Sequence, residues 1–200
     1  EVEGAVRFDP PNATEPVGAA IIASATGPGG QLANGAVSVD LELPDIATAS
    51  LSQRLGDRVE FLADIAWTGW SSIQELTVVR TDGTVLSTTP EQWDDTWRFA
   101  LGLNYELNTS LTLRAGLALD ETPVPDETRT ARLPDPDRTW VSIGARWDSG
   151  EAFVIDAGYA HLFSDDVPLD QDQDNIPAYG LLNGQQNSAV DIVGVQVGYR

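Results

Sequence analysis

The sequence contains no cysteine, no methionine and no lysine. Without cysteine the chain has no disulfide, no thiolate metal site and no cysteine nucleophile. Its 11 basic residues, all arginines, are set against 31 Asp and Glu, and a net charge of -20 leaves no cationic surface for a nucleic-acid backbone. Six Trp, four Tyr and five Phe are spread among the other apolar residues, so an acidic disordered tail is excluded as well.

Long hydrophobic runs are also missing. No segment reaches the ~18 to 20 consecutive apolar residues that a membrane-spanning helix requires. The chain starts at Glu1 without an initiator Met or an apolar signal segment, which predicts a processed product or a piece of a longer protein. If this chain crosses a membrane, strands must cross it.

Alternation of apolar with polar or very small residues predicts strands almost throughout. It is clearest over 97–107, where odd positions are Trp, Phe, Leu or Tyr and even positions are Arg, Ala, Gly, Asn or Glu. The pattern predicts eight strands, at about 1–9, 36–55, 58–80, 84–107, 110–125, 132–147, 151–163 and 188–200. Pro44 marks a bulge or kink in the second of them. We therefore expect an all-β, antiparallel segment over 1–200 with no domain boundary.

The predicted connections are of two kinds. Residues 56–57, 108–110 and 148–150 form tight hairpin turns, whereas 10–35, 120–137 and 164–187 are long and either acidic or rich in Pro and Gly. Going up and down through eight strands, every tight turn falls at one end and every long or extended connection at the other. Outer-membrane barrels have this polarity, with short periplasmic turns and long external loops.

A soluble sandwich would also show alternation, but the positions of the aromatic residues favour a membrane barrel. On the apolar face, aromatics lie near both ends of the strands, as Trp97 and Tyr105 do. The segment from Trp97 to Leu107 covers about 25 Å of membrane normal at ~3.3 Å per residue and a ~40° tilt. The opposite face combines Gly and Ala with charged residues, which suits a wet lumen.

A further motif points to one family. It consists of residues 120–125 (DETPVP), Arg129, residues 133–144 (LPDPDRTWVSIG) and the ending Val197-Gly198-Tyr199. These segments resemble the FadL-type outer-membrane transporters of long-chain fatty acids and aromatic hydrocarbons. The resemblance covers most of 36–200. It implies a fourteen-stranded barrel with an N-terminal plug, of which this chain would be the last eight strands. The missing half and the plug would then be partners, alongside outer-membrane lipid.

The resemblance predicts a function and its location. We expect passive diffusion of hydrophobic compounds, most of all long-chain fatty acids, across the bacterial outer membrane through a lumenal apolar site. No enzyme activity, cofactor or resident metal is expected, and the sole histidine, His161, is expected in the interfacial belt on the lipid side. A small, self-closed eight-stranded barrel with a structural or adhesive role is the alternative, because the length alone suits it.

Parity along the strands selects the candidate ligand-binding residues. The even positions place apolar side chains in the lumen, namely Leu62, Trp70, Leu76 and Trp140, with Leu162 and Ile192 beside them; packing against a plug would need the same contacts. Arg114, Arg138 and Arg146 also point inward and could hold a carboxylate, with Arg138 the preferred candidate and structural ion pairing the alternative. Pairing Leu107 with Leu111 and Leu55 with Val59 sets Arg98 opposite Asp120 and Arg54 opposite Glu60.

One acidic loop has the beginning of a cation-binding pattern. Residues Asp170 to Asn175 place carboxylates at alternate positions, as a calcium loop begins. The sixth position is Asn instead of Gly and the twelfth is Leu181 instead of Glu, so a solvated acidic loop is the favoured interpretation.

Overall fold

The computed structural model describes residues 2–7, 16–27, 30, 32–172 and 181–199. The chain divides into two compact units, one made of residues 1–43 and 73–91 and the other of 44–72 and 92–200. The prediction of a single segment over 1–200 did not anticipate this division. Among the described residues, no helix is long and apolar enough to cross a membrane.

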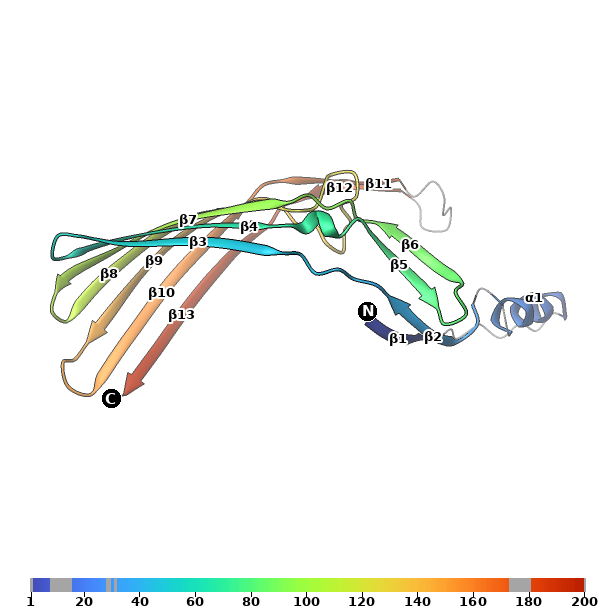
Figure 1. Ribbon diagram of the computed structural model, residues 1–200, viewed down its shortest axis with the longest axis horizontal. Coiled ribbons are helices and arrows are strands. Elements are labelled where there is room, and N and C mark those ends of the chain that lie inside the picture. The colour runs from blue at the N-terminus through green and yellow to red at the C-terminus, as the bar shows by residue number, and fades with distance from the viewer. Residues whose placement is uncertain (1, 8–15, 28–29, 31, 173–180, 200) are drawn as a thin grey trace. The chain divides into compact units, whose positions relative to one another are not determined.

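The larger unit is built on an open, antiparallel sheet of seven strands (Figure 1). In spatial order these are β13 (Ala189–Tyr199), β10 (Phe153–Ser164), β9 (Arg138–Asp148), β8 (Leu111–Asp120), β7 (Thr96–Asn108), β4 (Val59–Thr68) and β3 (Ile46–Leu55). A short hairpin of β11 (Val167–Asp172) and β12 (Leu181–Gln186) and the 3-10 helix η1 (Trp70–Ser72) belong to the same unit. Because the order has two ends, β3 and β13, the described strands do not close on themselves.

The smaller unit contains a four-stranded sheet and one helix. Its strands lie in the order β1 (Val2–Val6), β2 (Gly35–Val39), β5 (Glu75–Arg80) and β6 (Val85–Pro90), and α1 spans Pro16–Thr26. The first predicted strand therefore pairs with β2 and is not part of the seven-stranded sheet. Part of the predicted loop 10–35 is helical, and the rest of that loop lies partly outside the described residues.

Three strands that were predicted as continuous are broken, which corrects the predicted strand boundaries. The segment 36–55 divides into β2 and β3 around Pro44, whose missing N–H interrupts a ladder. The segment 58–80 divides at η1, and 84–107 divides after Pro90, where Gln92 adopts a φ of 51°. Around Pro44 the odd positions stay apolar on both sides, so that break is invisible to periodicity. Beyond η1 the apolar positions become even, as Leu76 and Val78 are, which is a sequence sign that β5 does not continue β4.

Within the seven-stranded sheet the tight turns and the long connections lie at opposite ends, whereas the predicted loop 10–35 belongs to the smaller unit. Tight turns join β3 to β4, β7 to β8 and β9 to β10 at one end of the seven-stranded sheet (Figure 1). Gly56 and Gly150 occupy these turns at φ of 71° and 78°, a region that side chains other than glycine rarely adopt. At the other end, the connections 69–95, 121–137 and 165–188 are long.

The register gives the tilt of the strands. One row of paired residues crosses five strands, from Val59, the first residue of β4, to Tyr105, Leu113, Ala145 and Ala157. Ala157 lies four residues beyond Phe153, the first residue of β10. If the tight turns lie at one level, the sheet shears by about one residue per strand. A rise of ~3.3 Å over a spacing of ~4.8 Å corresponds to a tilt of about 35°, within the range of membrane barrels.

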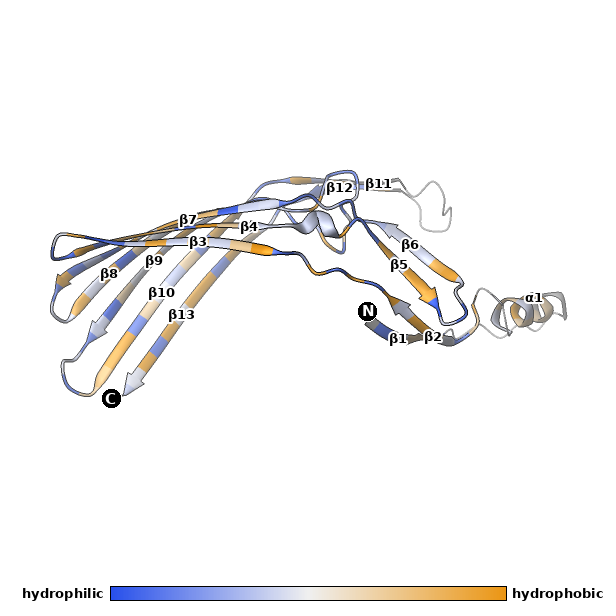
Figure 2. Cartoon of the chain, viewed as in Figure 1, coloured by the Kyte–Doolittle hydropathy of each residue, from blue (hydrophilic) through white to orange (hydrophobic). Residues whose placement is uncertain are grey.

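Parity separates two faces across all seven strands, because every pair in the register joins two even or two odd residues except Asn108 and Leu111 at a bulge beside the β7–β8 turn. The odd face, called the outer face below, carries the exposed apolar side chains Phe99, Leu101, Leu117, Ile143 and Val195. The even face, called the lumen face, carries Gly, Ala and the charged residues. Figure 2 shows the resulting alternation of hydrophobic and hydrophilic bands along the strands. Exposed leucines beside paired arginines fit an oily exterior and a polar interior.

Candidate functional site

The lumen face is organised in tiers, counted from the tight turns. Toward the tight-turn end of the strands the even positions are mostly charged or polar: Arg54, Glu60, Glu106, Arg114, Arg146, Asp156 and Gln196. Nearer the middle of the strands come small residues, and toward the outer end Arg98, Asp120 and Arg138 share one row of the register. A molecule moving along this face would pass a tier of charged side chains, then a tier of small residues, then a second tier of charged side chains.

In the inner tier, the one nearest the tight turns, acidic and basic side chains form ion pairs. Asp156 lies between two arginines, 3.0 Å from Arg114 and 3.6 Å from Arg146. Arg54 pairs with Glu106 at 2.5 Å, and not with Glu60, which is its neighbour in the register. The predicted opposition of Arg54 and Glu60 in the register is confirmed, and the Arg54 guanidinium reaches past the adjacent strand to Glu106.

The middle tier is a belt of glycines, called the glycine belt below: Gly102, Gly116, Gly144, Gly158 and Gly194, one on each of five adjacent strands. The wall demands glycine at some of these positions. A Cβ at Gly116 would lie 2.7 Å from the Ser142 hydroxyl, whereas a Cβ at Gly194 would meet no atom within 4 Å. Packing therefore does not explain Gly194, and the bare wall there leaves space in the lumen.

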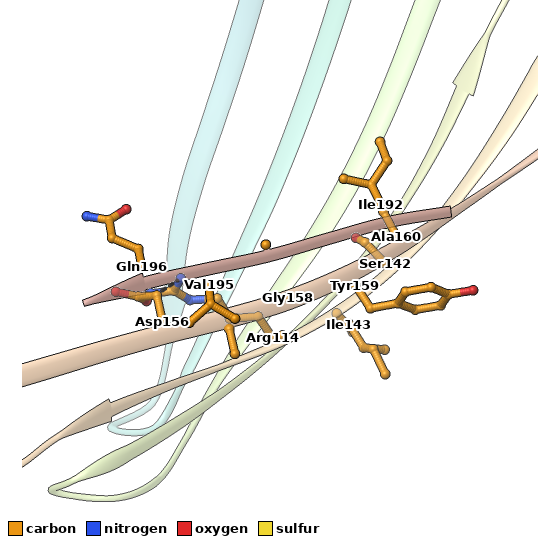
Figure 3. Close-up of a pocket in the computed structure, with 14 residues that line it drawn as sticks. Arg114, Ser142, Ile143, Asp156, Gly158, Tyr159, Ala160, Ile192, Val195 and Gln196 are labelled. Atoms are coloured by element: carbon orange, nitrogen blue, oxygen red, sulfur yellow. Dashed lines mark ion pairs between the residues drawn. The ribbon is translucent and has the colours of Figure 1, made fainter. Parts of the chain in front are cut away.

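A hollow of about 580 Å³ lies against the glycine belt of β9, β10 and β13 (Figure 3). On the lumen face it is bordered by Arg114, Asp156 and Gln196 at one end and by Ser142, Ala160 and Ile192 at the other. Figure 3 shows Ile192 and Gln196 on one side of the sheet and Tyr159 and Ile143 on the other. The hollow is thus apolar along its length with an ion pair at its inner end.

The outer tier contains an arginine without a carboxylate partner. Of the five arginines on the described lumen face, Arg98 alone forms no ion pair with a described residue. The register with Asp120 is confirmed as predicted, yet the Arg98 guanidinium lies over the Trp140 ring, 5.9 Å from its centroid. Ala118, the residue of the intervening strand β8 that pairs with Trp140, has a short side chain and leaves room for this approach. A guanidinium on an indole face gains a cation–π interaction.

Arg138, the preferred candidate from sequence, is held by the loop that precedes it. It forms an ion pair with Asp135, whose other oxygen accepts a hydrogen bond from the Thr122 hydroxyl at 2.9 Å. Asp137 accepts a hydrogen bond from the Thr122 backbone N–H at 2.7 Å. The charged residues of the 120–138 motif thus brace the β8–β9 loop, as the ion-pairing alternative predicted.

The other predicted site residues divide between the two units. Leu62, Trp140 and Arg114 lie on the lumen face, with Leu62 beside Gly102. Trp70 lies on η1 and packs edge-to-face on Trp93, with ring centroids 5.3 Å apart. Leu76 lies in β5 of the smaller unit and is not part of the seven-stranded sheet. Sequence reasoning missed Arg98, because opposition in the register suggested that Asp120 neutralises it.

The predictions for a metal site and for the sole histidine can be compared with the described part of the chain. No group of three or more His, Asp or Glu side chains there could hold a metal ion. The calcium-loop hypothesis falls on Asp170 to Asn175, whose side chains lie outside the described residues. His161 occupies the outer face, as its odd position predicted.

Comparison with known proteins gives the family. The model of the family described as "Outer membrane protein transport protein (OMPP1/FadL/TodX)" matches residues 1–200. The chain is 38% identical over 125 residues to a 47 kDa outer membrane protein of Pasteurella multocida, covering 62% of the chain and 29% of that protein. It is 30% identical over 131 residues to the long-chain fatty acid transport protein of Escherichia coli K12, covering 66% of the chain and 29% of that protein.

A solved structure agrees. The crystal structure of a Pseudomonas aeruginosa FadL homologue superimposes with a TM-score of 0.74 at 33% identity, covering 83% of this chain and 38% of that one. The chain spans about three tenths of the length of the curated relatives it matches. The Escherichia coli relative is a transport protein by name, and the Pasteurella multocida relative is named as an outer membrane protein. The chain belongs to the FadL family of outer-membrane transport proteins and forms part of an antiparallel transmembrane β-barrel.

Proposed function

We propose that this chain forms the part of a FadL-type barrel wall along which long-chain fatty acids diffuse. The acyl chain lies along the glycine belt and the hollow beside Ile192, and the carboxylate is received by Arg98. The observation that carries this proposal is the pairing of an arginine without a described carboxylate partner with a bare apolar wall on one face.

The arrangement favours an amphiphile over a neutral hydrocarbon. Burying an alkane needs only the apolar wall, whereas a carboxylate loses its hydration unless a donor replaces it. Arg98 offers up to five N–H donors, and the Trp140 face holds the guanidinium in place. Arg114, whose partner Asp156 is shared with Arg146, offers a second, weaker carboxylate site at the inner end of the hollow. A fatty acid therefore meets one cation at each end of the belt.

The open edges define the partners of this sheet. In lipid, each unpaired backbone group costs several kcal/mol, so β3 and β13 require neighbours. We propose that the remaining strands of the barrel supply them and that a plug governs release from the lumen. An open order of strands does not favour the alternative of a self-closed barrel with a structural or adhesive role.

Ligand binding separates these possibilities. The full chain, reconstituted in lipid vesicles, is titrated with palmitate and with hexadecane. Both have a long alkyl chain, but only palmitate has a carboxylate. Arg98→Ala removes a charge-assisted hydrogen bond to the carboxylate, which is worth ~1.5 to 3 kcal/mol. The variant should therefore bind palmitate about tenfold more weakly or worse, and its hexadecane binding should be unchanged.

The matched control is Arg138→Ala, which removes a lumenal arginine already held by Asp135. It should change palmitate binding far less than Arg98→Ala does. Equal losses of palmitate and hexadecane binding in Arg98→Ala would make Arg98 structural and refute the carboxylate site.

A further inference from the structure

A polar cluster interrupts the oily outer face at β10 and β13. Asp191 accepts a hydrogen bond from the Tyr159 hydroxyl at 2.6 Å, and the Nδ1 atom of His161 lies 2.7 Å from the same oxygen, Oδ1. Phe163 packs edge-on against the imidazole at a centroid distance of 4.3 Å. All four residues are odd, so they share the face of Leu101 and Val195. The Asp191 side chain is 63% exposed, and no described residue bonds its Oδ2 atom.

The strand geometry places this cluster at the outer membrane–water interface. Asp191 lies eight residues from Tyr199, and His161 eight from Phe153; these two aromatics pair beside the tight turns. Trp97 likewise lies eight residues from Tyr105 on β7. Eight residues at ~3.3 Å each and a tilt of about 35° cover about 22 Å of membrane normal. The cluster is therefore level with Trp97, where an apolar band of about 25 Å gives way to headgroups.

An apolar groove runs from the cluster toward the tight turns. It encloses about 570 Å³ on β8, β9, β10 and β13, and Tyr159 borders both the groove and the cluster. Ala145 and Ala157 are paired in the register and form its floor on the outer face, and the larger side chains Leu113, Val193 and Val195 flank them. Two short side chains between longer ones make a trough of the kind that a lipid chain fills by close contact.

We propose that this face binds one phosphate-bearing lipid of the outer leaflet, its acyl chain in the groove and its phosphate joined to Asp191 through a divalent cation. The Asp191 side chain is largely exposed, Tyr159 and His161 contact its Oδ1 atom, and its Oδ2 atom has no described partner, so Oδ2 is open to a cation. The described chain has no third ligand nearby, so phosphate oxygens and water complete the six or more that a hard divalent cation takes. This inference concerns the outer face and does not depend on the lumenal ligand.

The single histidine of the chain makes the site directly observable. The full chain, labelled with 13C-histidine, is placed in bilayers of phosphatidylglycerol or phosphatidylcholine and titrated with Mn²⁺, which broadens nearby NMR signals. We expect the His161 imidazole signals to broaden at a Mn²⁺ concentration at least tenfold lower in phosphatidylglycerol. Asp191→Asn should remove this difference, whereas Asp156→Asn on the lumen face should preserve it.

A second measurement tests the groove independently. Ala157→Leu fills its floor and should reduce the number of phosphatidylglycerol molecules that native mass spectrometry finds retained on the chain, while Ala160→Leu on the lumen face should not. Broadening that is equal in both lipids or unaffected by Asp191→Asn overturns the proposal. So does tight retention of phosphatidylethanolamine without any divalent cation, since that result would assign the carboxylate to an ammonium headgroup.

Discussion

Replacing Leu101 with arginine tests which face of the sheet meets hydrocarbon. Leu101 lies on the outer face, 53% exposed, four residues from Trp97 and four from Tyr105. Four residues at ~3.3 Å each and a tilt of about 35° place it about 11 Å from each aromatic, at the middle of the apolar band. An arginine at the bilayer midplane of a barrel costs ~2 to 4 kcal/mol and one near an interface ~0 to 1. Leu101→Arg should therefore lower the free energy of unfolding by about 2 to 4 kcal/mol.

Two variants calibrate that measurement. Ala100→Arg places the same side chain on the lumen face opposite Asp64, and Leu107→Arg places it on the outer face beside a tight turn; both should cost about 1 kcal/mol or less. The assay is urea unfolding of the chain in lipid vesicles, followed by tryptophan fluorescence and read from the transition midpoint. The face assignment is refuted if Ala100→Arg costs more than Leu101→Arg, or if the three costs are equal.

Two further substitutions test the lumen and the external connections. Gly194→Leu should leave the free energy of unfolding within about 0.5 kcal/mol, because its Cβ meets open space, but should slow fatty acid uptake into vesicles by filling the hollow; unchanged uptake would place the route elsewhere. Hydrogen bonds from the Ser71 hydroxyl and backbone N–H lower the pKa of Asp95, which lies between β6 and β7. That contribution to stability is present above the carboxyl's unfolded pKa of about 4 and is lost as the pH falls through the lower folded value. Asp95→Asn should flatten the acid side of a stability–pH curve, and an unchanged slope below pH 4 would contradict this role.

Alternation in the sequence determined the two faces and much of the pairing. A period of two is a property of the extended backbone itself, so Leu101 and Arg98 are assigned to opposite faces without knowledge of any neighbour. Tight turns then fix the register of adjacent strands, which is why Arg98 opposite Asp120 and Leu55 opposite Val59 were both predictable. The prediction for Leu107 and Leu111 failed only locally, because a bulge at Leu107 pairs Asn108 with Leu111.

Tertiary structure alone decided which strands share a sheet and which side chains meet. The breaks at Pro44, η1 and Pro90 send β2, β5 and β6 to a separate sheet. Arg98 reaches Trp140 because Ala118 on the strand between them is short, and Asp191 meets His161 although 30 residues separate them in sequence. Such contacts depend on side-chain reach and on which strands become neighbours, and a local repeat contains neither.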